Sequence, residues 1–517
     1  MKNSIFRLGL SLWAVSTMLF ILACSDDDEQ SYGSFAIDQT DITLESSEAA
    51  TAVVKITSPS NWKAEISANW LQFATGTQTY GTPCRALALT LTATTNREEA
   101  ERTATITFTD FTGASKSLAL TVKQPGHEPY NYAGENASAP DGMKSNAALL
   151  MTYMNTGWNM GNTMESTGAD ETSWGNPRIT KAMIDALKAQ GFNVVRFPVR
   201  WTPRSNEDMD IDPTCLARVK EVVDYAYSQG MYVILNSHHD RFYDRVVPGT
   251  LVETKEGILG KFAHLWTQIA TTFKEYDEHL LFAGTNEVIY ISQGNEIWDE
   301  PTDENLYLYM NDLNQTFINA VRATGGNNAW RTLVVQPWSC SPQLALKHFV
   351  KPEDSVADRL MLEFHYYQPW SFCQQGDNDS WGGNHYYWGA PYAQLPHATN
   401  TESDMLELFG NLKHQFVDKG LPVIMGEYGA VKHRKTTGNQ GMGINFTLSE
   451  ESRAYYLEFV VREAKNHGFA ALFWDNNCID TTGENFGLFD RNNGMKPYSE
   501  QAVAAIQKGA ETGVYPF

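Results

Sequence analysis

The sequence is short of cysteine and of positive charge, and each shortage excludes a class of protein. Six cysteines occur in 517 residues. Those after Cys24 show no spacing typical of a zinc site or a disulfide framework, although a single bridge remains open, so we expect no metal and no cofactor. Lysine and arginine number 39 against 61 acidic residues, and the net charge of -22 argues against nucleic acid as a partner. After Cys24, no run is apolar and long enough to cross a bilayer.

Aromatic residues, by contrast, are abundant. The chain contains 14 Trp, 23 Tyr and 25 Phe. Most are expected in the core, but flat rings are also suited to stacking on sugar rings. A neutral polymer would not be repelled by an acidic surface, so a polysaccharide ligand is compatible with both features.

The first 23 residues predict a targeting segment. Lys2 and Arg7 precede an apolar stretch from 8 to 23, which is typical of a secretory signal peptide. Ile21-Leu22-Ala23-Cys24 resembles the lipobox of bacterial lipoproteins, which implies that Cys24 is lipidated and that residues 24–34 form a tether. The acidic run 25–29 resembles the signal that sends some Gram-negative lipoproteins to the outer cell surface. We therefore expect a lipid anchor in the outer membrane, with the protein facing the cell exterior. The alternative is an ordinary secreted protein with an acidic N-terminus.

Residues 35–125 predict a small all-β sandwich. Thr, Ser, Ala and Val dominate, and apolar residues alternate with a period of two, without a competing helical period. The segments 61–66 and 122–126 resemble the BACON-type domain, an immunoglobulin-like module often found ahead of surface glycosidases. Residues 126–142 are expected to form a linker. The aromatic residues of the sandwich are expected in its core or as spacers, while a sugar platform stays open as the alternative: Trp62, Trp70, Phe73 and Tyr80.

From residue 143 to 517, short apolar strands alternate with helical periodicity. Eight such units predict an α/β fold, the (β/α)8 or TIM barrel. One helical stripe runs from Leu306 to Val321, and Thr447 with Glu450 predicts a capping box for a later helix. The longest insertion, 368 to about 401, is expected after the sixth strand. The strands are expected to begin near Gly157, Val194, Tyr232, Leu280, Thr332, Leu360, Val423 and Ala471.

Two of the expected strands end in a glutamate. The apolar run 422–428 presents Glu427, and the run 280–287 presents Glu287. The carboxyl ends of all strands meet at one face of a barrel, where enzymes of this architecture carry their active sites. Paired carboxylates are what glycoside hydrolysis requires, one as nucleophile and one as acid/base. The other expected strand-end residues are polar or aromatic: Asn162, Arg196, His238, His239, Asn286, His365, Tyr367 and Trp474.

Six motifs in this set resemble glycoside hydrolase family 5, and they occur in the family's order over the whole barrel. The segments 157–163 and 174–177 and the pair His238-His239 are similar to its endoglucanase and xyloglucanase branch. The resemblance implies a retaining β-glycanase. The motifs are Asn193-Val-Val-Arg-Phe-Pro-Val199, Asn236-Ser-His238, Asn286-Glu287, His365-Tyr-Tyr367, Gly426-Glu427-Tyr428 and Phe473-Trp474.

Each role also has a physical basis. Glu427 must be ionised to attack the anomeric carbon, and we expect Arg196 and Tyr367 to stabilise its charge. Glu287 must keep its proton, and we expect the ionised Glu427 across the cleft to raise its pKa. Asn286 is expected to bond the sugar 2-hydroxyl. The remaining residues are expected to contact substrate, with Trp474 as a floor for the sugar ring and with polar contacts from Asn162, His238, His239 and His365.

Three alternatives stay open. Asn295-Glu296 is a second Asn-Glu pair after an apolar run, but Glu287 is preferred because the helix end, turn and buried strand before it follow the family's order. The run 238–240, His-His-Asp, has the composition of a metal cluster, but adjacent residues on a strand point to opposite faces. Arg196 could instead form a structural ion pair inside the barrel.

The sequence thus predicts a retaining endo-β-1,4-glucanase whose partner is a β-glucan. Xyloglucan is the first choice, followed by mixed-linkage glucan and cellulose, with mannan and xylan open. The chain is expected to be a monomer. The rival from another class is a surface glycan-binding lipoprotein on a disused barrel, which loss of one catalytic carboxylate would favour; both are present. An open cleft that cuts within chains is expected from the loop aromatics Trp174, Trp201, Trp338, Trp370, Trp381, Tyr386, Tyr387 and Trp388.

Overall fold

Two compact units make up the chain, with the division between residues 127 and 128. The computed structural model describes residues 32–44, 50–74, 76–94, 96, 100–111, 116–126, 133–377, 383–479 and 484–517. The expected signal peptide, the lipidation site Cys24 and most of the tether lie outside these residues. In the described part of the chain, no helix has both the length and the apolar character needed to cross a membrane.

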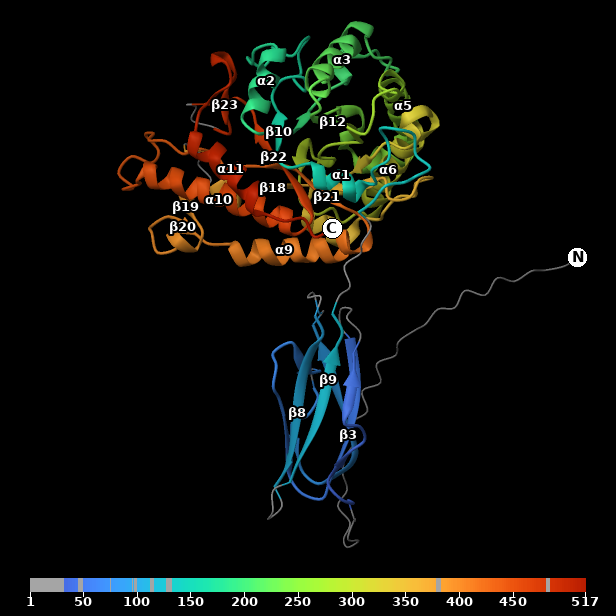
Figure 1. Ribbon diagram of the computed structural model, residues 1–517, viewed down its shortest axis with the longest axis vertical. Coiled ribbons are helices and arrows are strands. Elements are labelled where there is room, and N and C mark those ends of the chain that lie inside the picture. Colours follow the sequence, from blue (N-terminus) through green and yellow to red (C-terminus); the bar gives the residue numbers. More distant parts are fainter. Residues whose placement is uncertain are drawn as a thin grey trace, which may run out of the picture. The chain divides into compact units, whose positions relative to one another are not determined.

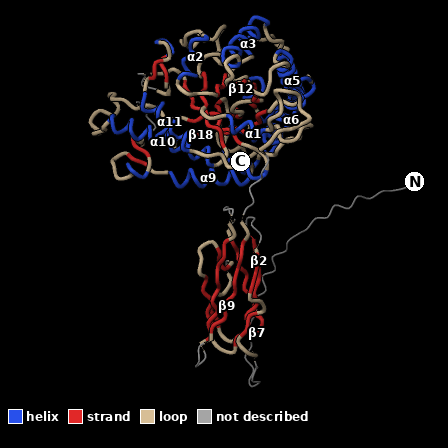
Figure 2. The backbone as a smooth tube through the Cα atoms, viewed as in Figure 1, coloured by secondary structure: helices blue, strands red, loops and turns tan. Residues whose placement is uncertain are grey.

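The first unit is a β-sandwich, and Figure 2 shows it as strands and loops. Alternate residues of the long strands form the core, among them Leu89 and Leu91 on one sheet and Ile106 and Phe108 on the other. One sheet has the order β1 (Ala36–Ile37), β3 (Ala50–Ser58), β7 (Cys84–Ala93), β5 (Leu71–Phe73). The other has the order β2 (Asp41–Thr43), β9 (Ser117–Gln124), β8 (Arg102–Asp110), β4 (Trp62–Ile66), β6 (Tyr80–Gly81). The pairs are antiparallel except for the parallel pair of β2 with β9.

The aromatic residues of the sandwich are divided between core and surface. Trp62 is 1% exposed, and its indole N–H donates to the carbonyl of Thr82. Trp70 packs against the core and faces the guanidinium of Arg102, whose carbon lies 4.5 Å from the ring centroid. Tyr80 is 76% exposed. Trp62 is therefore a core residue and cannot be part of a sugar platform.

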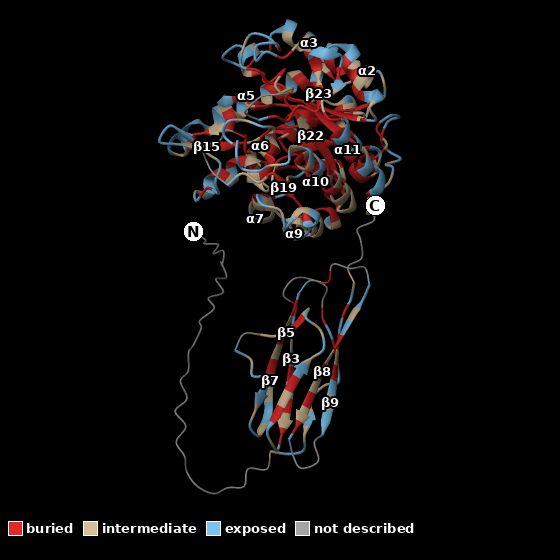
Figure 3. Ribbon diagram, turned by 90° about the vertical axis from the view of Figure 1, so that its left-hand side faces the viewer, coloured by how far each residue is buried: buried red, intermediate tan, exposed pale blue. Residues whose placement is uncertain are grey.

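The second unit is a closed barrel of parallel strands surrounded by helices (Figure 1). The first and last strands pair with each other, which closes the barrel. The strands are almost wholly buried because helices cover their outer face and side chains fill the interior, as Figure 3 shows in red. They are β10 (Gly157–Met160), β11 (Val194–Phe197), β12 (Tyr232–Asn236), β14 (Leu280–Ala283), β17 (Leu333–Val335), β18 (Leu360–Tyr366), β21 (Val423–Tyr428) and β22 (Phe469–Asp475). The predicted fold class is confirmed.

The helices of this unit follow the strands as expected, but one predicted cap is wrong. The side chain of Asn445, not Thr447, caps the helix that begins at Phe446, because it accepts the N–H groups of Thr447 and Leu448. Glu450 instead pairs with Arg453 at 3.0 Å. The helices are α1 (Ala147–Tyr153), α2 (Lys181–Ala189), α3 (Pro213–Tyr227), α4 (Arg241–Asp244), α5 (Pro248–Thr272), α6 (Glu304–Ala323), α7 (Pro342–His348), α8 (Trp370–Cys373), α9 (Glu402–Gln415), α10 (Phe446–Asn466) and α11 (Glu500–Thr512).

Most of the loop aromatics predicted to line an open cleft are buried instead. The long insertion after β18 contains α8, β19 (Tyr387–Trp388) and β20 (Ala398–Thr399), and its Trp388 belongs to the core cluster of the barrel. Trp388 packs there against Tyr455, Tyr456 and Phe459 of α10. Trp174 and Trp370 are exposed, Trp381 lies outside the described residues, and the buried ones are Trp201, Trp338, Tyr386, Tyr387 and Trp388. The described cysteines are all free thiols: Cys84, Cys215, Cys340, Cys373 and Cys478.

Candidate active site

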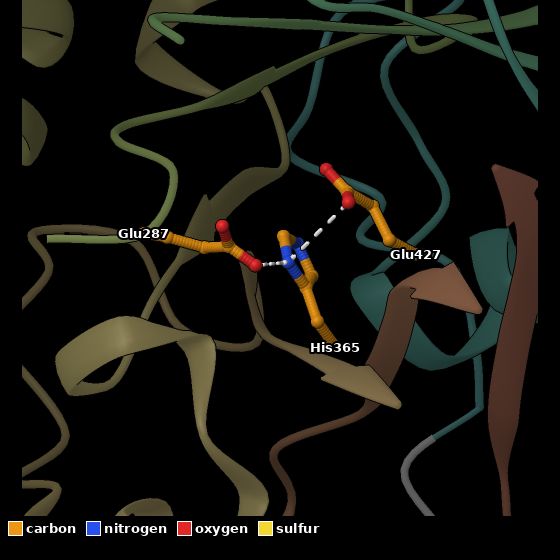
Figure 4. Close-up of side chains that lie close together, drawn as sticks. All are labelled: Glu287, His365 and Glu427. Carbon is orange, nitrogen blue, oxygen red and sulfur yellow. Dashed lines mark hydrogen bonds and ion pairs between the residues drawn. The ribbon is translucent and has the colours of Figure 1, made fainter. Parts of the chain in front are cut away.

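Glu287, His365 and Glu427 meet at the carboxyl ends of β14, β18 and β21. Figure 4 shows His365 between the two carboxylates. His365 Nδ1 lies 2.7 Å from Glu287 Oε1 and 3.6 Å from Glu427 Oε2. A carboxylate oxygen of each glutamate and a ring nitrogen of His365 all lie within 4.8 Å of one another. The structure therefore brings both predicted glutamates together around one imidazole.

Local backbone features set this arrangement. The register of β18 against β21 shifts between Phe364 and His365, so that His365 pairs with Glu427. A Cβ at Gly426 would lie 1.9 Å from Glu363 Oε1. Glycine is therefore required before Glu427, because the Glu363 carboxylate occupies the space of a side chain.

Glu427 is held by a cation and a phenol. Arg196 Nη1 donates to Glu427 Oε1 at 2.8 Å, and the Tyr367 hydroxyl donates to Oε2 at 3.0 Å. Arg196 is fully buried, and its Nη2 donates to Asn286 Oδ1 at 2.7 Å. The guanidinium thus positions Glu427 and the amide beside Glu287 together, which makes it part of the site as well as an ion pair.

The site contains buried polar residues that the sequence reasoning missed. Asn159 Oδ1 accepts a second bond from Arg196 Nη1 at 2.9 Å. Glu363 Oε1 lies 3.0 Å from Arg196 Nη2, and its Oε2 accepts from Gln336 Nε2 at 2.8 Å. A signal for Glu363 was available, because it precedes His365 by two positions on one strand and so shares its face.

The pKa directions of the two glutamates are opposite to those expected. Burial alone would raise the pKa of Glu287, but the charge and hydrogen bond of His365 hold it below its ordinary value. Burial raises the pKa of Glu427 despite His365 and Arg196, and the Glu287 charge adds to the rise. Burial would lower the pKa of His365, but its neighbours, with Cys340 and Glu427 foremost, raise it well above 6.5. These directions favour the proton on His365, because a cation between two carboxylates is stabilised by both.

His238, His239 and Trp474 form an aromatic patch. The rings of His238 and Trp474 are parallel within 8°, with centroids 5.8 Å apart. The two histidine rings meet edge to face at 4.2 Å, so the expectation that they point to opposite faces is wrong. Both follow β12 instead of lying in it, and His239 has a φ of 57°. Asp240 accepts bonds from Trp201, Thr202 and Ser237, which removes it from any metal cluster with these histidines.

Asn162 is the predicted site residue that the structure places differently. It lies in the turn after β10, where its backbone N–H donates to Glu165 and its carbonyl accepts from Asn176 Nδ2. The expectation that it ends the first strand is wrong. The strand presents Asn159 instead, which pairs in register with Arg196.

The second Asn-Glu pair lies in a surface hairpin of β15 (Ile289–Ser292) and β16 (Asn295–Ile297). Glu296 pairs there with Arg245 at 3.0 Å and with Arg241 at 3.3 Å. Its carboxylate is engaged by these arginines and does not join the cluster around His365, whereas that of Glu287 does.

Among the described residues, several buried polar atoms of the site have no hydrogen-bond partner, and two of them belong to predicted substrate-binding residues. They are Asn286 Nδ2, beside Glu287, and His239 Nδ1. A buried polar group without a partner is costly unless a ligand satisfies it. Together with the paired carboxylates, these atoms fit a hydroxyl-rich substrate whose glycosidic bond lies between Glu287 and Glu427.

Comparisons with known proteins point the same way. Residues 156–479 match the model described as cellulase (glycosyl hydrolase family 5), and residues 60–125 match one described as a putative binding domain, N-terminal, BACON. A xyloglucan-specific endo-β-1,4-glucanase of Bacteroides ovatus is 32% identical over 503 residues, 94% of each chain.

Solved structures show the same likeness. A Bacteroides ovatus family 5 xyloglucanase in complex with a heptasaccharide superposes with a TM-score of 0.63 at 30% identity, covering 92% of this chain and all of that one. A xyloglucan-specific β-1,4-glucanase from a ruminal metagenomic library has a TM-score of 0.64 at 36% identity, covering 72% of this chain and 98% of that one. With the strand-end carboxylates and the matched barrel, the chain belongs to glycoside hydrolase family 5.

Proposed function

We propose that the chain is a retaining endo-β-1,4-glucanase that cleaves internal bonds of a β-glucan, with xyloglucan as the preferred polymer. The separation of the carboxylates carries the chemical part of this proposal. One oxygen of Glu287 lies within 4.8 Å of one oxygen of Glu427, and so close an approach favours the separation of roughly 5–5.5 Å between carboxyl groups of a retaining enzyme over the roughly 6.5–9.5 Å that seats a water in an inverting one. At the retaining separation no water fits between the two carboxyl groups, so one carboxylate attacks the anomeric carbon directly.

In the first step Glu427 attacks the anomeric carbon and the bond to the leaving oxygen breaks. Arg196 and Tyr367 orient the attacking carboxylate, and the attack forms a glycosyl ester. Glu287 gives a proton to the leaving oxygen. In the second step Glu287 takes a proton from water, the water oxygen attacks the same carbon, and Glu427 leaves. Two inversions retain the configuration.

His365 supplies the proton that makes Glu287 an acid. The imidazolium donates from Nδ1 to Glu287 Oε1 over 2.7 Å, a charge-assisted bond short enough for direct transfer. A sugar in the cleft excludes water and disfavours the charged pair, so the proton moves to Glu287 and the neutral imidazole remains. This account replaces the expectation that the ionised Glu427 raises the pKa of Glu287, because His365 lowers it.

The choice of polymer is supported by the relatives. Both the Bacteroides ovatus enzyme and the ruminal enzyme are named for xyloglucan. The rival, a glycan-binding lipoprotein on a disused barrel, would not need two carboxylates and an imidazole in mutual contact. The direct test is product analysis with purified xyloglucan, mixed-linkage glucan, cellulose and mannan. Intermediate-length products, with a β-anomer first in proton NMR, are expected from xyloglucan; an α-anomer would contradict retention.

We also propose that the protein is a monomer attached to the outer membrane through lipid on Cys24, with an independent barrel. Cys24→Ala should release the protein from membranes and leave hydrolysis in vitro within about twofold. A protein that begins at Gly126 should hydrolyse soluble polymer at a similar rate, because the barrel has its own core. An insoluble or inactive barrel would show that the sandwich belongs to the catalytic unit.

A further inference from the structure

The segment that carries Glu287 lies beyond the end of its strand and is held by residues from elsewhere in the chain. β14 ends at Ala283, and residues 286–288 belong to the loop that follows it. Each of their three backbone carbonyls accepts a hydrogen bond from a distant residue, so the position of the acid/base depends on contacts outside its own strand. The donors are Cys340 Sγ to the carbonyl of Asn286 at 3.3 Å, the Ser339 N–H to that of Val288 at 3.0 Å, and Arg245 Nη1 to that of Glu287 at 3.1 Å.

Arg245 is the charged donor of these three. It follows α4 directly, and its side chain is 8% exposed. Its Nε donates to Glu296 Oε1 at 3.0 Å, and Asp244 Oδ2 lies 3.0 Å from its Nη1. Charge-assisted bonds of this kind are stronger than neutral ones, and the planar guanidinium offers its donors in a fixed geometry. Two carboxylates thus hold the guanidinium while it bonds the backbone of Glu287.

The charge of Arg245 also acts on the carboxylates around it. Burial would raise the pKa of Glu287, but the charges of His365, His239 and Arg245 lower it, with His365 foremost. Burial raises the pKa of Asp244 to about 7, and Arg245 is the charge that opposes this rise most. Removal of Arg245 would therefore free the backbone of Glu287 and also leave Asp244 buried without its main counter-charge.

We propose that Arg245 is a positioning residue for the transfer of a proton from Glu287 to the leaving oxygen. It acts through the backbone of the acid, which it fixes in place. Proton transfer needs the two heavy atoms to approach within about 2.6–3.2 Å, and a misplacement of about 1 Å can cost about 10²-fold in rate. The inference rests on the proposed function and adds a further residue to its acid step.

The test compares two substrates whose leaving groups differ in their need for an acid. 2,4-Dinitrophenolate leaves without a proton, whereas phenolate is a poor leaving group that needs one. Arg245→Met keeps the aliphatic stem and should lower kcat/KM for phenyl β-cellotrioside about 30-fold. The loss for 2,4-dinitrophenyl β-cellotrioside should be no more than about threefold, so the ratio of the two values falls about tenfold.

Two further variants control for folding and for loss of charge. Asp244→Asn combined with Arg245→Met removes the buried charge that the single variant leaves unpaired, a charge that can by itself unfold a protein. This double variant should show the same fall in the ratio. Arg241→Met removes the exposed arginine that also pairs with Glu296, at 3.3 Å, and keeps the bond from Arg245 to Glu287. It should leave the ratio within about twofold of wild type.

A merely structural arginine behaves differently. Its removal would lower both values equally, together with the melting temperature. Equal losses in the folded double variant, or no loss with the phenyl substrate, would overturn the inference.

Glu287→Ala is the benchmark for the acid step itself. It should lower kcat/KM for the phenyl substrate at least about 10²-fold more than for the dinitrophenyl substrate. Without that difference Glu287 is not the acid, and the proposed function fails together with the inference. If the difference is present but the ratio in the Arg245 variants is unchanged, the inference alone is overturned.

Discussion

Asn286-Glu287 and Asn295-Glu296 are the same dipeptide, and each follows an apolar run, yet their surroundings differ. Glu287 lies at the mouth of the barrel, 2.7 Å from a buried imidazole. Glu296 lies on an exposed hairpin, where two arginines neutralise it. The charge and the hydrogen bond of His365 lower the pKa of Glu287 despite its burial. The comparison teaches that the neighbours of a carboxylate, and not the dipeptide that contains it, decide whether it can do chemistry.

The comparison also shows how one motif can serve a site in two ways. Asn286 presents its side chain to Arg196, whereas Glu296 holds Arg245, which in turn bonds the backbone of Glu287. The second pair therefore supports the segment of the first. Substitution of Glu287 should therefore lower turnover by orders of magnitude more than substitution of Glu296.

The largest effect is expected when either carboxylate at the barrel mouth is removed. Glu287→Ala and Glu427→Ala should each lower kcat on soluble xyloglucan by about 10⁴-fold or more, because each removes a reacting group. Initial rates measure the loss, and circular dichroism checks the fold. Azide should restore turnover in Glu427→Ala only, since it replaces a nucleophile and not an acid on an unactivated substrate. Near-normal turnover in either variant would show that the site is wrongly assigned.

A large effect on the pH profile is expected from His365. Activity should fall at low pH as Glu427 is protonated, with a midpoint above 4.5 because its pKa is raised. It should fall at high pH as the proton shared by His365 and Glu287 is lost, with a midpoint above 6.5. His365→Asn should lower kcat by about 10²-fold and move the high-pH midpoint downward, because Glu287 then holds the proton alone. A high-pH limb that does not move would remove His365 as the proton source.

Substitutions in the buried cluster should also destabilise the fold more than substitutions in the hairpin. Glu363→Ala breaks a buried pair with Arg196 and should lower the free energy of unfolding by about 3–5 kcal/mol. Glu296→Ala breaks one exposed pair, with Arg241, and one pair with the buried Arg245 whose carboxylate end lies near the surface, and it should cost less, on the order of 1 kcal/mol. Urea unfolding of both variants measures the difference. Equal losses would mean that the hairpin is as integral to the barrel as the buried cluster.

The smallest effect on catalysis is expected from Glu296→Gln. The two ion pairs of Glu296, whose carboxylate lies near the surface, contribute on the order of 1 kcal/mol, which corresponds to a loss in kcat/KM of about fivefold. A loss as great as that of Glu287→Ala would reverse the assignment of the two pairs.

The sequence by itself was sufficient to predict the barrel and its two glutamates. Buried parallel strands need continuous apolar runs, and such runs stand next to Glu287 and Glu427 in the sequence. Family motifs such as His365-Tyr-Tyr367 marked most of the other strand ends, with Asn162 after β10 as an exception. The period-two pattern predicted the sandwich in the same way, because its core residues alternate along single strands.

Only the tertiary structure decided which residues complete the site and where the proton lies. Glu363 is far from Arg196 in the chain, and a contact of that kind depends on how the barrel closes. Most of the expected cleft aromatics are buried in the barrel core, and Trp388 reaches it by packing on α10. The pKa directions of Glu287 and Glu427 depend on burial and on distances to His365, which no local pattern records. The sequence thus determined which groups stand at the strand ends, whereas packing determined their charges, because electrostatic interaction depends on distance and solvation.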